Sequence, residues 1–312
     1  MSKKISSIIV TGATSMIGSA IVAEALEQNK KVAAVVRKNS PQICNLTNLK
    51  NNHHLEMIEC ALEDYASLKF NSEYDAFIHT AWKNTNVDSR DNVHSQIDNI
   101  RYTIDAVHAA ESAGCDVFID AGSQAEYGRV ADSQRLSGNT PCNPESGYGI
   151  AKFTAGKMAF LETAKFGLRF CHTRILSVYG EGMSDQSLIM GLIKSLQANG
   201  KPSLTKCEQI WDYMYVRDTA RAFLAIAEKG VNGKTYPIGS GTAKPLREYV
   251  EIIRGIINPA AELGFGEKDY YPHQPMILCA DTAELFKDTG FKPLVNFEDG
   301  IKIMMNCMKK DL

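Results

Sequence analysis

The sequence lacks the residue spacings that commonly hold a metal ion or build a disulfide framework. Its eight cysteines are scattered and form no C-x-x-C pair, and its seven histidines include no H-x-x-x-H. Because such pairs are the usual source of zinc ligands, we expect no metal site. Scattered cysteines in a chain of 312 residues are typical of reduced, mostly buried side chains.

Long runs of one residue type are also missing. No apolar stretch is long enough to span a membrane, and no run of lysine or arginine would form a nucleic-acid surface. The net charge is −2, with 44% hydrophobic residues, which is ordinary for a globular protein. The stretch MSKKISSIIV has no long apolar core of the signal-peptide kind. We therefore expect a cytoplasmic protein with neither a nucleic-acid nor a membrane partner.

The first half of the chain alternates between strand and helix patterns. Apolar, β-branched runs predict strands at 8–10, 31–36, around Met57, 76–81, 116–122 and 168–176, and helical spacing predicts helices at 17–28, 99–113 and 147–163. Such alternation predicts an α/β fold with a doubly wound parallel sheet. We place this sheet in residues 1–176, joined by part of 212–238. A smaller, interleaved C-terminal α/β lobe for the substrate takes up 177–312.

The segment IIVTGATSMIGSA, residues 8–20, runs from a strand through a short turn into a helix. Helix N-termini attract phosphate, so the turn is a candidate pyrophosphate loop. Ser15 stands where a G-x-x-G-x-x-G pattern has its middle glycine, and its hydroxyl is able to donate to a phosphate. A generic strand–turn–helix junction is the alternative interpretation. The candidate cofactor residues here are Thr11, Gly12, Thr14, Ser15, Met16, Ile17 and Gly18.

The second strand ends at Arg37 and Lys38. An acidic residue at this place holds the ribose 2′-hydroxyl of NAD, whereas a guanidinium pairs with the 2′-phosphate of NADP. Arg37 therefore favours NADP, with NAD as the alternative cofactor. An ordinary solvated charge pair would look the same.

Two hydroxyls and a lysine form the candidate catalytic set. Tyr148 and Lys152, in SGYGIAKF, lie four positions apart and so share one face of a helix. Ser123 ends a strand 25 residues before Tyr148, where its hydroxyl would assist proton transfer at a substrate carbonyl. A surface Tyr–Lys pair alone is frequent by chance, and it is the combination with Ser123 and the phosphate loop that indicates catalysis.

Several motifs together resemble the extended short-chain dehydrogenases/reductases of the nucleotide-sugar epimerase/dehydratase type. TGATSMIG resembles the TGxxGxxG loop, FIHTAW a V-x-H-x-A strand, YGIAK the catalytic Y-x-x-x-K, and TRILSVYG an R-x-x-N-x-Y-G segment. The resemblance implies a Rossmann-type domain, a nicotinamide dinucleotide, a nucleoside-diphosphate sugar as substrate, and a possible homodimer.

The resemblance also implies further site residues. For the cofactor these are Leu62, Thr80, Ala81 and Trp82, together with Tyr148 and Lys152. For the substrate they are Trp82, Lys83, Ser123, Gln124, Tyr148, Ser177 and Trp211. A core position for Trp82 and a solvated loop position for Lys83 are the alternatives.

The chain departs from the family pattern at informative places. Ser177 replaces an asparagine and Trp211 an arginine, both of which often meet the sugar nucleotide in relatives. Dehydratases of the family carry T-D-E where this chain has Ser123, Gln124 and Ala125. Without the Asp–Glu pair, elimination is disfavoured. Glu126 is one position out of register, and we interpret it as structural.

Three functions fit these residues. The first is hydride reduction of a 4-keto-6-deoxysugar nucleotide, with Tyr148 as proton donor. The second is a 4-epimerase that keeps NAD tightly bound. The third, from another class, is a non-catalytic dinucleotide sensor on the same fold, although a sensor has no need of a proton-transfer trio.

Overall fold

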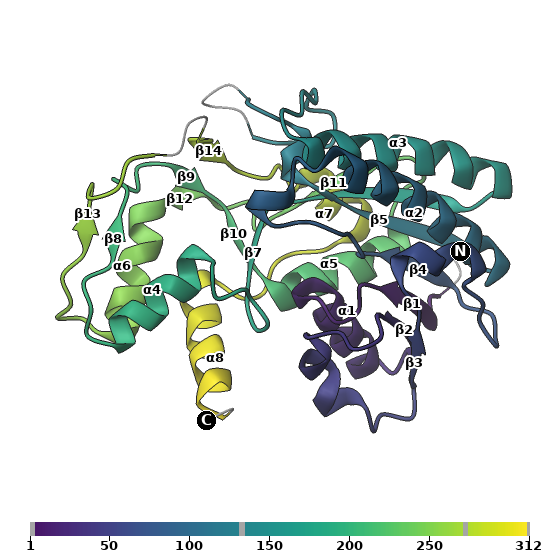
Figure 1. The fold of residues 1–312 in the computed structure, drawn as a ribbon, viewed down its shortest axis with the longest axis horizontal. Coiled ribbons are helices and arrows are strands. Elements are labelled where there is room, and N and C mark those ends of the chain that lie inside the picture. Colours follow the sequence, from purple (N-terminus) through teal and green to yellow (C-terminus); the bar gives the residue numbers. More distant parts are fainter. Residues whose placement is uncertain (1–3, 131–134, 271–273, 311–312) are drawn as a thin grey trace.

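The computed structural model describes residues 4–130, 135–270 and 274–310. At its centre lies a seven-stranded sheet in which every neighbouring pair of strands is parallel (Figure 1). Across the sheet the strands are β11 (Thr235–Ile238), β6 (Arg169–Ile175), β5 (Val117–Ser123), β4 (Ala76–His79), β1 (Ser7–Thr11), β2 (Lys31–Val36) and β3 (Leu55–Glu59).

Helices cover both faces of this sheet, which explains why its central strands β1, β2 and β4 consist mainly of apolar residues. On one face Ile8 and Val10 pack with α1 (Met16–Glu27) and α5 (Val216–Lys229). On the other face Ile9 packs with α2 (Val93–Ser112) and α3 (Gly147–Phe166). The doubly wound α/β fold predicted from the strand–helix alternation is confirmed.

The helix α2 begins earlier than the sequence pattern predicts. It starts at Val93 instead of Asn99, after the side chain of Asn92 caps the helix by accepting from the Ser95 amide. Val93 and Ile97 are 61% and 58% exposed. Because the apolar residues of the first turns do not face the core, these turns carry no core-directed periodicity to detect.

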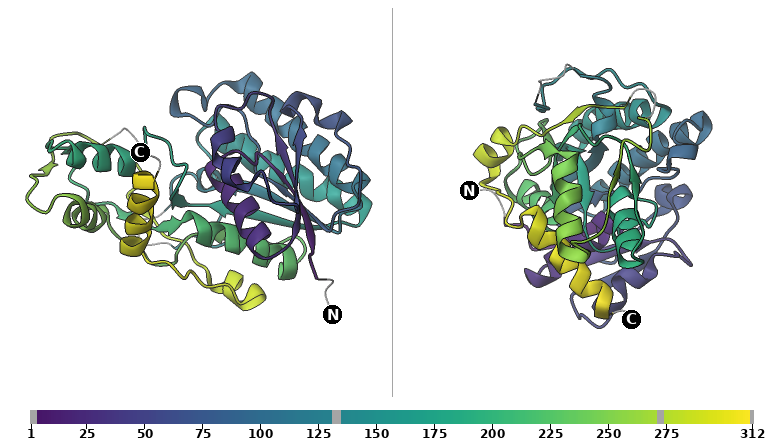
Figure 2. Two further views of the ribbon diagram at one scale, coloured as in Figure 1. Left: turned by 90° about the horizontal axis from the view of Figure 1, so that it is seen from below. Right: turned by 90° about the vertical axis from the view of Figure 1, so that its left-hand side faces the viewer.

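The second part of the chain forms a smaller lobe beside the sheet (Figure 2). Its helices α4 (Leu188–Gln197), α6 (Leu246–Ile257) and α8 (Phe297–Lys310) pack around a separate apolar core, while α7 (Ala283–Thr289) packs against α5. Its short strands are β7 (Ser177–Tyr179), β8 (Ser203–Leu204), β9 (Ile210–Trp211), β10 (Tyr213–Tyr215), β12 (Lys244–Pro245), β13 (Gly264–Phe265) and β14 (Ile277–Leu278). Although α5 and β11 come late in the chain, they belong to the main sheet layer. The division into lobes at residue 176 stays a prediction.

The strand order reverses between β1 and β4. The chain runs outward from β1 to β2 and β3, then returns to place β4 on the other side of β1. Thr11 and His79 lie side by side at the carboxyl ends of these two strands. Ligands of doubly wound sheets bind at this kind of position. Within the described ranges, no helix combines the length and apolarity needed to cross a bilayer.

Candidate active site

The turn after β1 has a backbone shape that requires glycine at two positions. Gly12 has a φ of 65°, and a Cβ there would lie 2.8 Å from the amide nitrogen of Ala81. A Cβ on Gly18 would lie 2.2 Å from the carbonyl oxygen of Gly12. The turn is therefore packed tightly against Ala81, two positions after β4, and against the first turn of α1.

Ser15 is the N-cap of α1. Its Oγ accepts a hydrogen bond from the Gly18 amide at 3.1 Å. That bond uses Oγ only as an acceptor, so the hydroxyl hydrogen is still able to donate to an anion. The first amides of a helix have no partner within the helix and attract phosphate. The turn thus fits a dinucleotide pyrophosphate even though its middle glycine is replaced.

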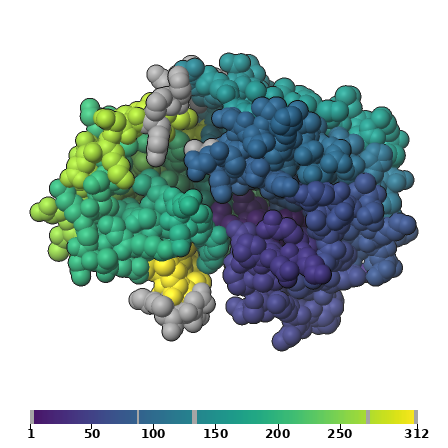
Figure 3. All heavy atoms as spheres, in the orientation of Figure 1, coloured from purple at the N-terminus to yellow at the C-terminus, as the bar shows by residue number. Residues whose placement is uncertain are grey.

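A cavity of about 340 Å³ opens beside this turn. The space-filling view shows a hollow between the purple and blue N-terminal residues and the teal lobe (Figure 3), and the residues that line the cavity all belong to the N-terminal side of it, between Gly12 and Thr85. Eight of the predicted cofactor residues line the cavity: Gly12, Thr14, Ser15, Arg37, Leu62, Thr80, Ala81 and Trp82. The other six do not line it: Thr11, Met16, Ile17, Gly18, Tyr148 and Lys152. Four of these six lie in the end of β1 and the first turn of α1.

An ion pair that the sequence did not reveal stands in the cavity wall. Lys83 Nζ lies 2.6 Å from Glu63 Oε1, and both residues, like Arg37, line the cavity. The hydrogen bond from Lys83 lowers the pKa of Glu63, and the charge of Arg37 adds to this effect. The Asn99 side chain makes two hydrogen bonds to the backbone of Lys83. Its Oδ1 accepts from the Lys83 amide and its Nδ2 donates to the Lys83 carbonyl oxygen, each at 2.9 Å. Lys83, predicted to bind substrate, therefore lines the cavity beside the Gly12 turn together with eight of the predicted cofactor residues.

Lys152 is buried beneath the cavity wall and is only 3% exposed. Its Nζ donates to the carbonyl oxygen of Ala121 at 2.6 Å and lies 3.7 Å from the ring centroid of Trp82. Burial lowers the pKa of Lys152 to about 8, although the charges of Asp120 and Glu126 oppose that shift. Trp82 therefore lies between Lys152 and the cavity: it contacts the Lys152 ammonium and also lines the cavity.

Tyr148 lies on the same face of α3, next to Ser123 and Trp82. Its ring meets the Trp82 ring edge to face, with centroids 6.0 Å apart, and the Arg90 guanidinium lies 5.2 Å from its ring centroid. Burial raises the pKa of Tyr148, while a hydrogen bond with Ser123 and the charge of Arg90 act in the opposite direction. At neutral pH Tyr148 is therefore a protonated phenol. The structure thus gathers the three residues predicted to be catalytic.

The remaining predicted substrate residues occupy two places. Gln124 opens the short 3₁₀ helix Gln124–Glu126 directly after Ser123. Ser177 and Trp211 form a pair in the second lobe, where Trp211 Nε1 donates to Ser177 Oγ at 2.8 Å. The indole N–H of Trp211 is therefore hydrogen-bonded to the Ser177 hydroxyl. The two residues that depart from the family pattern are thus hydrogen-bond partners of each other.

The sequence analysis missed a group of buried charges below Ser123. Asp120, Glu126, His172 and Arg174 are each at most 5% exposed. Asp120 and His172 are register partners on β5 and β6. The available signal was Asp120 within the mainly apolar run VFIDAG, whereas His172 stands in the mixed strand RFCHTRI. Only the pairing of the two strands shows that the two side chains meet.

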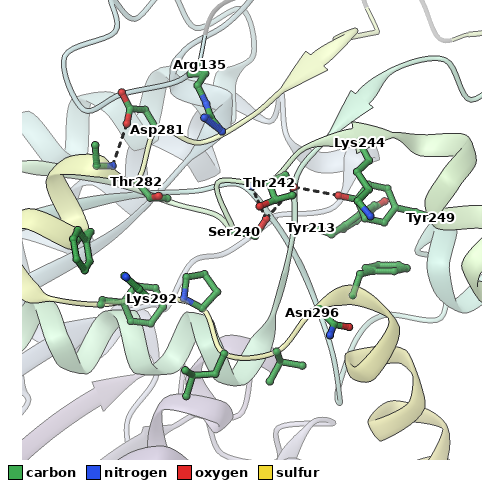
Figure 4. Close-up of a pocket in the computed structure, with 17 residues that line it drawn as sticks. Arg135, Tyr213, Ser240, Thr242, Lys244, Tyr249, Asp281, Thr282, Lys292 and Asn296 are labelled. Carbon is green, nitrogen blue, oxygen red and sulfur yellow. Dashed lines mark hydrogen bonds between the residues drawn. The ribbon is translucent and has the colours of Figure 1, made fainter.

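A larger cavity, of about 700 Å³, lies elsewhere (Figure 4). Arg135, Lys244, Lys292 and Asp281 are among its lining residues. Neither Ser123, Tyr148 nor Lys152 lines it, and it shares no residue with the cavity beside the Gly12 turn. Size alone therefore does not identify the candidate active site.

The phosphate-type turn and the gathered trio agree with a comparison against known families. Residues 8–239 match the family model described as "NAD dependent epimerase/dehydratase family". The chain belongs to this family. It is therefore an enzyme of the NAD-dependent nucleotide-sugar epimerase, dehydratase and reductase group, and the extended short-chain dehydrogenase/reductase resemblance is confirmed.

Curated relatives of this family member carry out different reactions. A putative UDP-glucose 4-epimerase of Methanocaldococcus jannaschii is 25% identical over 97% of this chain and 99% of the relative. A dTDP-4-dehydro-6-deoxyglucose reductase of Escherichia coli is 22% identical over 97% of each protein. These relatives do not single out one reaction.

Solved structures share the fold over nearly the whole chain. The UDP-N-acetylglucosamine 4-epimerase from Methanobrevibacter ruminantium M1 superposes with a TM-score of 0.88 at 23% identity, covering 99% of this chain and all of that one. DesIV, a dTDP-glucose 4,6-dehydratase from Streptomyces venezuelae with NAD and TYD bound, gives 0.86 at 20% identity, covering 98% and 97%.

Proposed function

We propose that the protein uses NADPH to reduce the C4 ketone of a 4-keto-6-deoxy nucleoside-diphosphate sugar. The observation that carries this proposal is the position of Tyr148, a protonated phenol beside Ser123. It lies next to Trp82, which lines the cavity beside the Gly12 turn. Reduction of a ketone consumes one proton at the carbonyl oxygen, and a protonated tyrosine supplies it.

Each member of the trio has a distinct task in this reaction. Tyr148 gives its hydroxyl proton to the C4 oxygen. The Ser123 hydroxyl donates a hydrogen bond to the same oxygen as negative charge develops on it. The Lys152 ammonium stabilises the phenolate that remains and holds the nicotinamide ribose. When bound, the dinucleotide supplies the hydride, and the Gly12–Gly18 turn, Thr80 and Ala81 would hold it.

Elimination of water, the dehydratase reaction, does not fit these residues. It needs an acid/base pair beside the ketone, and Gln124 and Ala125 follow Ser123 where that pair would stand. Glu126 does not replace it, because its side chain is fully buried and bonded to Arg174 and His172.

We infer that Arg37 directs the choice of cofactor toward NADP. Arg37 directly follows β2 and lines the cavity beside the Gly12 turn together with Ser40 and Gln42. A charge-assisted hydrogen bond to a 2′-phosphate contributes roughly 1.5–3 kcal/mol, equivalent to a preference on the order of tenfold to a hundredfold. Arg37→Asp should therefore shift the ratio of kcat/KM for NADPH over NADH toward NADH by about this factor. An unchanged ratio would remove Arg37 from this role.

A nucleotide-sugar 4-epimerase that keeps NAD bound is the second candidate, because curated relatives include an epimerase and the same trio serves both reactions. A panel of sugar nucleotides with and without a 4-keto group separates the two. The reductase purifies largely free of cofactor and consumes NADPH stoichiometrically with the 4-keto substrates. The epimerase purifies with NAD and interconverts two sugar nucleotides without added cofactor.

A homodimer formed through α2 and α3 is part of this proposal. These two helices pack together and leave a set of large apolar side chains exposed: Val93, Ile97, Ile150, Met158 and Leu161. Burial of such side chains against the same surface of a second copy would remove them from water. Light scattering of the wild type and of Leu161→Glu tests it, with a dimer expected for the first and a monomer for the second. A cytoplasmic location stays an expectation.

A further inference from the structure

Glu126 occupies the centre of the buried charge cluster below Ser123. It is 0% exposed. Its Oε1 accepts from the Ser123 amide at 2.8 Å, and its Oε2 accepts from Arg174 Nε at 2.8 Å. His172 Nε2 lies 2.9 Å from Oε2. Ser123 completes a reciprocal capping box, because its own Oγ accepts from the Ala125 amide at 3.2 Å.

The cluster pairs two acids with two bases. His172 bridges the two carboxylates, with Nδ1 at 2.9 Å from Asp120 and Nε2 at 2.9 Å from Glu126. Burial opposes a charged imidazole, but Glu126 and Asp120 raise the pKa of His172 to about 9. At neutral pH His172 is therefore cationic, and with Arg174 it balances the two carboxylates. A buried charge that is paired and hydrogen-bonded holds its partners in place, and removal of one partner is costly.

Glycines on two elements leave room for the cluster. A Cβ on Gly122 of β5 would lie 2.5 Å from His172 Cε1, and a Cβ on Gly156 of α3 would lie 2.6 Å from the same atom. The imidazole therefore fills the space between the strand that ends at Ser123 and the helix that carries Tyr148. In the first turn of α3, a Cβ on Gly149 would lie 2.4 Å from the Ala125 carbonyl oxygen.

We propose that Glu126 and His172 are positioning residues that set the Ser123 hydroxyl relative to Tyr148. The Glu126 carboxylate fixes the backbone of Ser123 by accepting a hydrogen bond from the Ser123 amide. The His172 imidazole fixes the separation of β5 and α3. The proposal rests on the proposed function of Ser123 and Tyr148. Glu126 is not a catalytic acid or base, because both its oxygens are occupied and none of its surface is open to a substrate.

A double-mutant cycle separates positioning from general stabilisation. Kinetics are compared for wild type, Glu126→Gln, Ser123→Ala and the double variant, with NADPH and a 4-keto sugar nucleotide. Displacement of a catalytic group by about 1 Å costs on the order of a hundredfold in rate. In Glu126→Gln the single remaining oxygen stays with the cations of Arg174 and His172, so the Ser123 amide faces an NH2 group and loses its acceptor. This variant alone should lower kcat about ten- to a hundredfold and change the KM for either substrate by less than about threefold. In the Ser123→Ala background it should cost less than about threefold, because the hydroxyl that it positions is gone.

Glu228→Gln is the matched control. It breaks a partly buried ion pair, in which Lys30 Nζ lies 2.7 Å from Glu228 Oε1, away from the trio. It should lower stability and leave kcat unchanged. If Glu126→Gln does not fold, His172→Gln takes its place in the cycle, since Glu126 then keeps its bond to Arg174. Equal losses of kcat in both backgrounds, or a wild-type kcat in Glu126→Gln, would overturn the proposal.

Failure of the proposed function gives a different result. In that case the wild type turns over no member of the sugar-nucleotide panel, whatever the state of Glu126. Hydrogen exchange at the Ser123 amide then tests the positioning itself. Glu126→Ala removes the acceptor of that amide and should accelerate its exchange at least about tenfold over that in Glu228→Gln. Equal exchange in the two variants would overturn the proposal.

Discussion

Replacement of Lys152 by methionine should remove activity without lowering stability at neutral pH. The side chain is 3% exposed, and burial lowers its pKa from 10.5 to about 8. One pKa unit corresponds to about 1.4 kcal/mol, so a charged Lys152 costs the folded state about 3 kcal/mol at pH 7. This cost is already net of the hydrogen bond to the Ala121 carbonyl and the contact with the Trp82 ring, because a pKa shift counts every interaction of the charged ammonium. A methionine of similar length carries no charge to bury, so Lys152→Met should be at least as stable as the wild type at pH 7, by up to about 3 kcal/mol.

The pH dependence gives the sharper measurement. Between pH 8 and 10.5 the unfolded lysine still binds a proton that the folded Lys152 has released. Stability contributed by this group therefore rises with pH in that window. The free energy of unfolding of wild type minus that of Lys152→Met, from urea titrations at several pH values, should increase by about 3 kcal/mol from pH 7 to pH 10.5. Groups that titrate in both proteins contribute equally to the two free energies of unfolding, so their contributions cancel in the difference.

Activity should change in the opposite direction. Only the charged ammonium stabilises the Tyr148 phenolate, so kcat/KM for NADPH, which reports the free enzyme, should fall as pH rises through about 8. Lys152→Met should lose most turnover, and the kcat/KM that remains should not fall as pH rises through about 8. If Lys152→Met were less stable than the wild type at pH 7, or if the difference in unfolding free energy did not change with pH, the charge of Lys152 would not be a cost of the fold.

Three further results are expected. Tyr148→Phe should lower turnover by about 10²–10⁴-fold while its thermal unfolding stays close to that of the wild type; near-wild-type turnover would exclude Tyr148 as the proton donor. Ser15→Gly should bind the dinucleotide about as well as the wild type in a titration, whereas Ser15→Leu should bind it much more weakly; equal affinity in Ser15→Leu would place the phosphates elsewhere. The only two tryptophans are Trp82 and Trp211. Bound dinucleotide should therefore quench tryptophan fluorescence in Trp211→Phe, which keeps Trp82, but not in Trp82→Phe. Quenching of equal size in both variants would mean that Trp82 does not border the bound cofactor.

Local sequence patterns predicted most of the first lobe because its elements carry their own signals. Strand β2, for example, is buried along nearly its whole length and needs a continuous apolar run. The start of α2 was missed for the converse reason. Val93 and Ile97 face away from the core, so the hydrophobic pattern there does not report a helix.

For the candidate site, the sequence was sufficient wherever a role depends on neighbours along the chain. Gly12 and Ser15 act within one turn, and Tyr148 and Lys152 share a helix face by spacing alone. The sequence did not predict Glu63 beside Lys83 or Trp82 against Lys152. Each of these contacts joins residues far apart in the chain, and a chance charge or aromatic residue gives the same local signal.

The sequence by itself therefore determined the α/β class, the phosphate-type turn and the Tyr148–Lys152 pair, since each follows from short-range geometry. The tertiary structure alone decided that His172 meets Asp120 and Glu126, because strand register, set by the packing of the whole sheet, aligns β6 with β5. The same packing decided the protonation states, since burial raises the pKa of Tyr148 and lowers that of Lys152. Desolvation depends on everything that surrounds a group, and a sequence shows only the residues beside it in the chain.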